Sequence, residues 1–269
     1  MSEWLGSLLE MTERIYQDVH RLFGSKISRK VVGHGAGGDI TRYIDAIAEE
    51  AAKKYVKKKK INCVLVCEEG GVEKIGEKPE VYLVIDAIDG TTNATRGIRF
   101  VSASIAASKV NRLSGVEAAA VMNLYDGGVY TAEKGGGAKY NGEKISPSNV
   151  EDLSIAVVSV DLSKSPETVN KVVPVLKKSG AIRSLGSAAL EICHVSSGRL
   201  DAYIDVREKL RTTDIAAATL IIKEAGGILL QPDGKPLKDS SLTKIERFSL
   251  IAAANAGIFR QIKALIQEV

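Results

Sequence analysis

The sequence contains few of the side chains that bind soft metals, with three cysteines and three histidines among 269 residues. A structural zinc site needs several such ligands at short spacing, but Cys63 and Cys67 flank an apolar run and Cys193 stands alone. We interpret Cys63 and Cys67 as small core residues of a buried strand. An odd number of cysteines in a chain of this length gives no disulfide framework and favours a reducing, cytoplasmic location.

Long apolar runs and a strong net charge are also missing. No stretch of about 18 apolar residues occurs, which argues against a membrane span, and Met1 to Gly6 lack the basic and apolar regions of a secretory signal. The net charge of +4 is small for a dedicated nucleic-acid-binding protein. The densest basic run, Lys53 to Lys60, is interpreted as the solvated end of a helix, where positive charge suits the helix dipole.

The spacing of apolar residues divides the chain near residue 150. Residues 1–150 are predicted as an α+β half and residues 151–269 as an α/β half, because strands and helices alternate regularly only in the second. In the first half we predict helices over residues 8–23 and 40–51, the second capped by Thr41, and strands over residues 63–67, 81–85, 101–107, 116–122 and 129–132. In the second half we predict strands over residues 155–160, 202–204, 228–230 and 250–253, and helices over residues 166–178, 187–197, 214–225 and 259–266.

Acidic residues follow two of the predicted strands. Asp86 and Asp89 come after the apolar residues 81–85, and Glu68 with Glu69 follows residues 63–67. Two like charges beside a buried strand are unfavourable unless a cation neutralises them. Carboxylate and carbonyl oxygens are the ligands of hard divalent cations such as Mg²⁺. The sequence therefore predicts a metal site at these strand ends.

Each acidic segment also has a simpler interpretation. Asp89 followed by Gly90 is typical of a tight turn, and Asp214, which opens an alanine-rich helix, is a good capping residue. The set as a whole carries the argument, because four acids at strand or helix ends with three histidines in the chain favour oxygen ligands over a zinc site.

A phosphate cradle is predicted next to these acids at Gly90, Thr91 and Thr92. Glycine lets the backbone approach a ligand, and free amides at a helix start bind phosphate. A metal cluster beside such a cradle indicates metal-assisted transfer of a phosphoryl group to water. The two residues between Asp86 and Asp89 argue against an aspartyl-phosphate enzyme, which typically has one. The absence of a P-loop motif argues against an NTPase.

The same residues resemble the motifs of the inositol monophosphatase superfamily, in the same order along nearly the whole chain. The matching segments are Glu68-Glu69, Asp86-Ala87-Ile88-Asp89-Gly90-Thr91, Gly186-Ser187-Ala188-Ala189, Gly198 to Tyr203, and Thr213 to Ala218 with Glu224 to Gly227. Asn93 to Ile98 is similar to the archaeal branch, whose members typically act on both fructose 1,6-bisphosphate and inositol 1-phosphate. The resemblance implies an α/β fold, a layered α-β-α-β-α sandwich, usually assembled as a homodimer.

The resemblance also implies roles for individual residues. The metal ligands would be Glu68, Asp86, Asp89, Asp214 and the carbonyl of Ile88, binding two or three Mg²⁺ ions that Mn²⁺ can replace. Thr91 and Asp45, together with Glu68, would orient and activate the attacking water. Gly90, Thr91 and Thr92 would hold the phosphate. Sugar or inositol would contact Gly186, Ser187 and Ala188. Arg183 and Arg207 are candidates for a second phosphate or ring hydroxyls, with a surface ion pair as the equal alternative, and the glycine-rich residues 33–39 would form a closing loop or a plain linker.

The implied function is hydrolysis of fructose 1,6-bisphosphate to fructose 6-phosphate and of inositol 1-phosphate to inositol, by direct attack of a metal-activated water, as in gluconeogenesis and related carbohydrate metabolism. A phosphatase acting on 3′-phosphoadenosine 5′-phosphate and a non-catalytic sugar-phosphate-binding protein are the alternatives. Ala87, Thr213 and Cys67 differ from the usual proline, tryptophan and glycine of the family, but none of these differences removes a ligand. The expected partners are small phosphorylated molecules, with no nucleic acid and no membrane.

Overall fold

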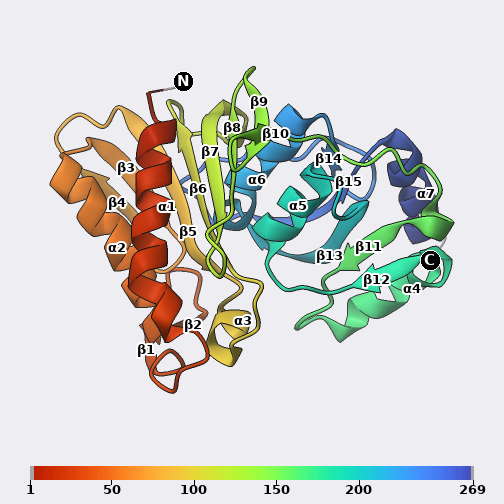
Figure 1. Cartoon of the computed structure of the whole chain (residues 1–269), viewed down its shortest axis with the longest axis horizontal. Helices are drawn as coiled ribbons and strands as arrows, with labels where there is room; N and C mark the ends of the chain where they lie inside the picture. Colours follow the sequence, from red (N-terminus) through yellow and green to blue (C-terminus); the bar gives the residue numbers. More distant parts are fainter. Residues whose placement is uncertain (1–2, 268–269) are drawn as a thin grey trace.

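The computed structural model describes residues 3–267, so Met1 and Ser2, part of the segment tested for a secretory signal, lie outside the described residues. Two sheets and the helices between and around them form five layers, seen edge-on in Figure 1. The layers run from α1 and α2, through an eight-stranded sheet, α5 and α6, and a five-stranded sheet, to α4 and α7. This arrangement confirms the predicted α-β-α-β-α sandwich.

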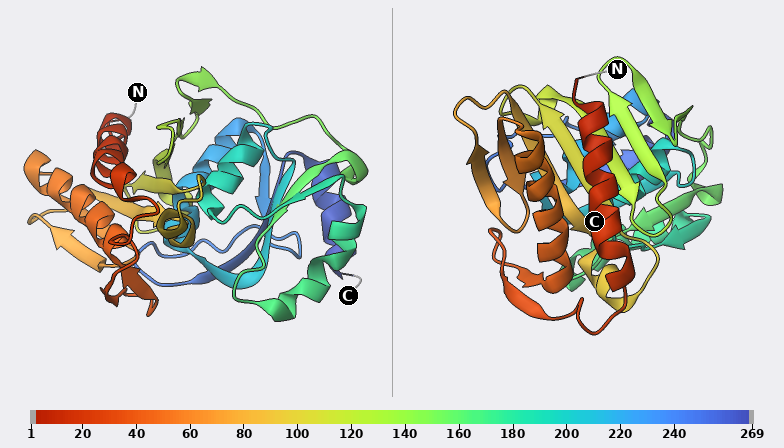
Figure 2. Two further views of the ribbon diagram at one scale, coloured as in Figure 1. Left: turned by 60° about the horizontal axis from the view of Figure 1, so that its bottom comes forward. Right: turned by 60° about the vertical axis from the view of Figure 1, so that its left-hand side comes forward.

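The eight-stranded sheet has the order β10-β9-β8-β7-β6-β5-β3-β4, in which only β3 and β5 pair in parallel. Its strands are β3 (Cys63–Cys67), β4 (Gly71–Ile75), β5 (Val81–Asp89), β6 (Ser102–Ser108), β7 (Val116–Asn123), β8 (Val129–Glu133), β9 (Gly137–Tyr140) and β10 (Glu143–Lys144). Figure 2 shows the helices of one outer layer lying side by side across this sheet: α1 (Leu5–Val19) and α2 (Tyr43–Lys59).

The five-stranded sheet has the order β12-β11-β13-β15-β14. Its strands are β11 (Val157–Val160), β12 (Ala181–Arg183), β13 (Ala202–Arg211), β14 (Ile228–Leu230) and β15 (Arg247–Ala253). The helices of the central and far layers are α5 (Ala188–Ser196), α6 (Thr212–Ala225), α4 (Val169–Lys178) and α7 (Ala256–Gln267). The remaining elements are a hairpin of β1 (Val31–His34) and β2 (Ile40–Arg42), the short helix α3 (Thr91–Arg96), and 3-10 turns at His20–Leu22, Leu113–Gly115, Leu153–Ile155 and Pro166–Thr168.

The strand β3 is a continuous apolar run because both of its faces are buried. Side chains alternate across a strand, and β3 has packed layers on both faces: Cys63, Leu65 and Cys67 enter the core beneath α1 and α2, whereas Val66 enters the core around α5 and α6. Cys63 and Cys67 are free and buried, as predicted for small core residues, and Cys193 is also free and buried. The central core draws on both predicted halves of the chain, and the division at residue 150 stays a prediction.

Several boundaries differ from the sequence predictions. The second helix begins at Tyr43 rather than near Ile40, because residues 40–42 form β2. Thr41 is therefore buried in a strand with its hydroxyl donating to Glu69, and its prediction as a helix cap is wrong. Six further elements were not predicted from the sequence, because they are short or rich in glycine and charge: β1, β4, β9, β10, β12 and α3.

The basic run ends the helix α2, as predicted. Lys60 adopts the left-handed conformation that closes α2, and Lys57, Lys58 and Lys59 are exposed. Within residues 3–267, no helix combines the length and the apolar character that a membrane crossing requires.

Candidate active site

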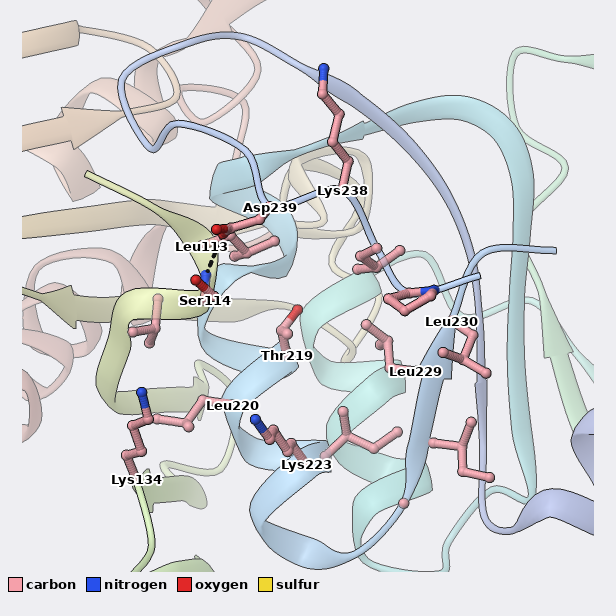
Figure 3. A pocket seen from close by; sticks show the side chains of 16 residues that line it. Leu113, Ser114, Lys134, Thr219, Leu220, Lys223, Leu229, Leu230, Lys238 and Asp239 are labelled. Atoms are coloured by element: carbon pink, nitrogen blue, oxygen red, sulfur yellow. Dashed lines mark hydrogen bonds between the residues drawn. The ribbon is translucent and has the colours of Figure 1, made fainter. Parts of the chain in front are cut away.

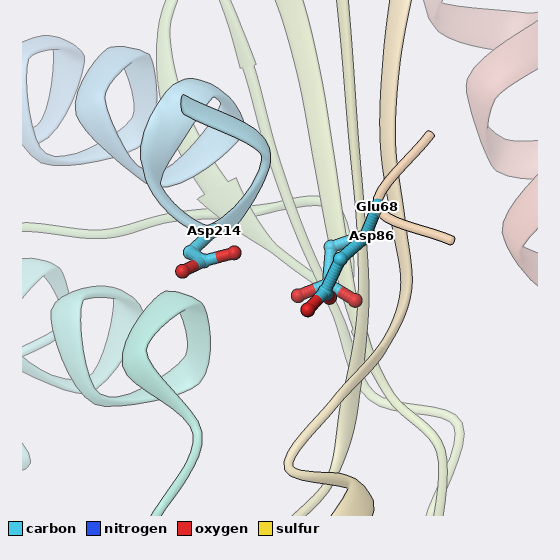
Figure 4. A group of neighbouring side chains, drawn as sticks. All are labelled: Glu68, Asp86 and Asp214. Carbon is cyan, nitrogen blue, oxygen red and sulfur yellow. The ribbon is translucent and has the colours of Figure 1, made fainter. Parts of the chain in front are cut away.

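Three carboxylates from separate elements meet between the eight-stranded sheet and α6. Glu68 follows β3, Asp86 lies in β5 and Asp214 lies in the first turn of α6, and each offers an oxygen within 4.8 Å of the others (Figure 4). The parallel register places Cys67 opposite Ile85, so Glu68 and Asp86 emerge at the same level of neighbouring strands. This donor set of closely spaced, partly buried oxygens fits a hard divalent cation.

A bulge in β5 aims a fourth carboxylate at the same region. Residues three apart on a regular strand face opposite sides of the sheet, but Asp86 pairs with Ser104 and Asp89 with Ser102, so β5 has one extra residue between them. Asp89 consequently lies close enough to Asp214 for this charge to raise the Asp89 pKa. The bulge therefore explains how two aspartates three positions apart can face the same site.

The carboxylates repel one another in a desolvated environment. Burial, followed by the neighbouring charges, raises the pKa of Glu68 and of Asp86 well above the ordinary range. Burial also raises the Asp89 pKa to about 7 and shifts the Asp214 pKa upward. Clustered acids with these pKa values form a site that a cation stabilises strongly.

Asp89 is held by the start of α5. Its Oδ2 accepts hydrogen bonds from the Ser187 hydroxyl and the Ala189 amide, each at 2.7 Å. Ser187 is fully buried and its Oγ also lies 2.9 Å from that of Ser102. The Ser187 side chain therefore fixes Asp89. Of the predicted segment Gly186-Ser187-Ala188, Gly186 is exposed, whereas Ser187 and Ala188 are buried.

Gly90 and Gly186 bring the two segments into direct contact. A Cβ on Gly90 would lie 3.0 Å from the Gly186 carbonyl oxygen, and Gly90 has a φ of +101°. Both constraints exclude larger residues, since L side chains disfavour this backbone region. The side-chain amide of Asn93 also connects the two segments, because it donates to the carbonyls of Phe100 and Leu185. The start of α3, with Thr91 and Thr92, is thereby fixed beside Asp89.

Asp45 and Thr91 form a pair next to the cluster. The Thr91 hydroxyl lies 3.0 Å from Asp45 Oδ1 and 3.4 Å from the Ile88 carbonyl oxygen, and Ile88 donates its amide to Asp86 Oδ1. Burial raises the Asp45 pKa to about 7. With Glu68, Asp86 and Ile88, Asp45 lines a space of about 10 Å³, close to the volume that one water molecule needs.

The helices α2 and α6 begin in the same way. In Arg42-Tyr43-Ile44-Asp45 and Arg211-Thr212-Thr213-Asp214, the arginine amide donates to Oδ2 of the aspartate three residues later, at 2.8 Å in both. Each aspartate thus satisfies a free amide at its helix start and keeps Oδ1 for other partners. The repeated Arg-x-x-Asp spacing was visible in the sequence, although the sequence analysis did not use it.

Arg211 connects the cluster to the β1–β2 hairpin. Its guanidinium forms ion pairs with Glu68, at 2.5 Å, and with Asp39 at the end of the glycine-rich segment. The guanidinium packs on Gly37, where a Cβ would lie 2.7 Å from Arg211 Cζ. The glycine-rich residues 33–39 therefore contact the metal-site residues through Arg211, which the sequence analysis missed because an ion pair 143 positions apart leaves no local signal.

A second ion pair supports the other side of Glu68. Glu49 Oε2 accepts from the amides of Glu69 and Gly70, both at 3.1 Å, and Glu49 is paired with Lys53 at 2.8 Å. Neither Glu49 nor Lys53 was predicted as a site residue, since both look like ordinary surface residues of a helix. They fix the turn that carries Glu68.

The two candidate arginines have different surroundings. Arg207 is almost buried and forms ion pairs with Asp205, at 2.5 Å, and Asp161, at 2.8 Å. Arg183 is exposed at the end of β12, and its Nη1 donates to the neighbouring Ile182 carbonyl; among residues 3–267 its guanidinium has no carboxylate partner. Arg183 is thus free to meet a ligand, whereas Arg207 is already neutralised.

A model of the inositol monophosphatase family matches residues 3–267. The chain belongs to the inositol monophosphatase family. The fructose-1,6-bisphosphatase/inositol-1-monophosphatase of Methanothermobacter thermautotrophicus is 33% identical over 276 residues, with 99% of this chain and 97% of that protein covered. A solved structure of an inositol monophosphatase-fructose 1,6-bisphosphatase matches with a TM-score of 0.85 at 32% identity, covering 98% of this chain and 100% of the other.

A longer protein with two activities in its name is also similar. The bifunctional NADP phosphatase/NAD kinase of Methanococcus maripaludis is 37% identical over 253 residues, which cover 85% of this chain. The matched region is 44% of the length of that relative, so this chain corresponds to about half of it. Family membership places the chain among phosphatases that hydrolyse phosphate monoesters.

Replacing Arg211 with Gln tests the link between hairpin and cluster. We expect the metal-free protein to lose about 1–3 kcal/mol of stability, between the values for exposed and buried ion pairs, because Arg211 is buried while Glu68 is partly exposed and Asp39 is exposed. In saturating Mg²⁺ the loss should be smaller, since the cation neutralises Glu68. Thermal unfolding with and without Mg²⁺ measures both, with Arg112→Gln as a surface ion-pair control. Equal losses in the two conditions would contradict this role.

Proposed function

We propose that this protein is a Mg²⁺-dependent phosphatase acting on fructose 1,6-bisphosphate and inositol 1-phosphate. The observation that carries the proposal is the meeting of Glu68, Asp86 and Asp214 beside the pair Asp45 and Thr91. The two substrates are supported by the similarity to the fructose-1,6-bisphosphatase/inositol-1-monophosphatase of Methanothermobacter thermautotrophicus, which the match covers over 97% of its length. A homodimer and a cytoplasmic location stay predictions.

In the proposed site, Glu68, Asp86, Asp89, Asp214 and the carbonyl of Ile88 hold two or three Mg²⁺ ions, with Mn²⁺ as a substitute. When bound, the cations would acidify a water molecule and neutralise charge on the phosphoryl group. The first-turn amides of α3 at Thr91 and Thr92, which have no acceptor within the helix, would hold phosphate oxygens. Gly186 and the adjoining backbone would contact the ring, and the exposed Arg183 a second phosphate.

The chain itself supplies the proton acceptor. Thr91 donates its hydroxyl proton to Asp45 Oδ1, so the Thr91 oxygen presents lone pairs to a water on its other side. A proton taken from that water can pass through Thr91 to Asp45. The Asp45 pKa of about 7 suits a base that works near neutral pH. Glu68 would orient the same water from the opposite side of the small space between them.

Phosphate release by the purified protein tests the proposal directly. We expect Mg²⁺-dependent release from fructose 1,6-bisphosphate and inositol 1-phosphate, and none after chelation of the metal. NADP belongs in the same assay, because 37% identity to an NADP phosphatase/NAD kinase favours NADP as a second candidate substrate. Comparison of kcat/KM ranks the three substrates. A folded, metal-loaded protein that releases phosphate from none of them would contradict the proposed function.

The raised pKa values predict how metal and pH act together. In the metal-free protein, Asp45 and Asp89 have folded pKa values of about 7 and unfolded values near 3.8, so folding favours their protonated forms. This contribution is fully present below about pH 4 and is lost as the pH rises through about 7. Mg²⁺ requires the ionised carboxylates, so its stabilisation should grow over the same range.

Thermal unfolding at about pH 5.5 and about pH 8 measures the effect. Mg²⁺ at about 100 times its dissociation constant should stabilise by roughly 2.7 kcal/mol, and a fixed sub-saturating concentration should raise the melting temperature more at the higher pH. NaCl at equal ionic strength is the control. A Mg²⁺ effect that is equal at both pH values would show that the cation binds elsewhere.

A further inference from the structure

A cavity of about 550 Å³ lies away from the carboxylates, between the C-terminal half of α6, the turn before β7 and the segment that follows β14. Figure 3 shows Leu113 and Ser114 on one side of Thr219, and Leu229 and Leu230 on the other. Most of the lining is apolar. This volume and lining are typical of pockets for small organic ligands.

The charges at the cavity do not balance. Asp239 is already satisfied, because it accepts from the Ser114 amide at 2.9 Å and faces Arg112 at 3.6 Å. Lys238 is paired with Glu246 at 2.7 Å. Lys134 and Lys223 also line the cavity, and within residues 3–267 neither has an ion-pair partner. Both side chains are exposed, so two solvated ammonium groups without a carboxylate partner stand at the rim of an apolar cavity.

Thr219 adds a polar group without a partner. Its hydroxyl is buried and, among the described residues 3–267, forms no hydrogen bond, although helical threonines commonly donate to the carbonyl four residues earlier. Thr219 is one of the residues that line the cavity. Thr219 follows Asp214 by five residues, about 7.5 Å along α6 at 1.5 Å per residue, so the cavity is separate from the carboxylate cluster.

We propose that this cavity binds a small organic anion with an apolar body. The apolar part would fill the space lined by Leu113, Leu220, Leu229 and Leu237, and the anionic group would meet Lys134 and Lys223. The combination excludes inorganic phosphate as the preferred ligand, because phosphate cannot use the apolar lining. A neutral hydrocarbon would fill the apolar space but gain nothing from the two lysines, so the anion should bind more tightly.

Calorimetric titration with naphthalene sulfonate tests the proposal. Mg²⁺ and inorganic phosphate are kept in excess to occupy the active site, and near-ultraviolet circular dichroism confirms the native fold. We expect one saturable site per chain and binding at least about tenfold weaker for the neutral analogue naphthalenemethanol, since a lost charged contact is worth about one factor of ten. The absence of saturable binding, or equal binding of the two probes, would overturn the proposal.

Matched variants locate the binding. Lys134→Glu and Lys223→Glu should each weaken the sulfonate about tenfold or more without affecting naphthalenemethanol, whereas Lys58→Glu, an equal charge change on exposed α2, should leave both unchanged. Leu229→Trp should remove binding of both probes by filling the cavity. Phosphatase activity should be preserved in all four variants, which shows that they fold. Sulfonate binding that survives all the cavity variants would place it elsewhere and refute the assignment.

Discussion

Replacing Asp86 with Asn is expected to lower kcat about 10³-fold. Bound metal ions stabilise a transition state by several kcal/mol, and each 1.36 kcal/mol that is lost lowers the rate tenfold. The Asn oxygen can still accept the Ile88 amide, so the strand end keeps its shape. The metal-free variant should unfold at a higher temperature than the wild type at neutral pH. The reason is that a buried charge, which repels Glu68 and Asp89, is removed.

The control for Asp86→Asn is Asp201→Asn. Asp201 is a buried aspartate in the second half of the chain, where it accepts the Val157 amide at 2.7 Å. Its replacement should lower stability and leave kcat within a few-fold. Steady-state kinetics and thermal unfolding of both variants provide the comparison. Substantial Mg²⁺-dependent turnover by a folded Asp86→Asn protein would rule out the proposed metal site.

Replacing Thr91 with Val is expected to lower kcat about 10²-fold with little change in KM. This is the smallest effect typical of losing a positioned proton-transfer group. Valine preserves the shape of threonine but cannot accept a proton from water or donate to Asp45. Thr91→Ser should recover most of the activity. Thr95→Val, which removes a hydroxyl from the same helix, should behave like the wild type.

The pH profile distinguishes proton transfer from a structural role of Thr91. In the proposed mechanism Asp45 acts as a base, so wild-type kcat/KM should rise with pH as the Asp45 carboxyl ionises. The rise should disappear in Thr91→Val, since Asp45 is then disconnected from the water. A Thr91→Val profile that keeps the rise at reduced amplitude would mean that Thr91 only supports the local structure.

Most of the fold was predictable from the spacing of apolar residues in the sequence. β3 and β14 coincide with the predicted strands because continuous apolar runs bounded by acids or glycines have few other structures. β4, with the sequence Gly-Val-Glu-Lys-Ile, was missed because an edge strand needs only one apolar face. The helix α3 was missed because its six residues lie below the length at which helical periodicity is visible.

The acids of the site were predictable, but their spatial relations were not. The positions of Glu68 and Asp86 after apolar runs marked them as unusual, yet their meeting depends on the parallel register of β3 and β5. The convergence of Asp86 and Asp89 depends on a bulge, which has no sequence signature here. Arg211 and Glu49 escaped prediction because their partners are distant in sequence or are backbone amides.

The shared Arg-x-x-Asp starts of α2 and α6 constrain how this site can evolve. Asp45 and Asp214 each satisfy the first amide of a helix with one oxygen and serve the site with the other. Glutamate and glutamine can also reach this amide, but their longer side chains would move the other oxygen away from its present position, and alanine would lose the amide contact. Asparagine keeps both the helix start and the side-chain length while abolishing the charge. A lineage that abandons catalysis but keeps the fold should therefore drift to asparagine at these two positions, which makes them diagnostic when active members of the family are separated from inactive ones.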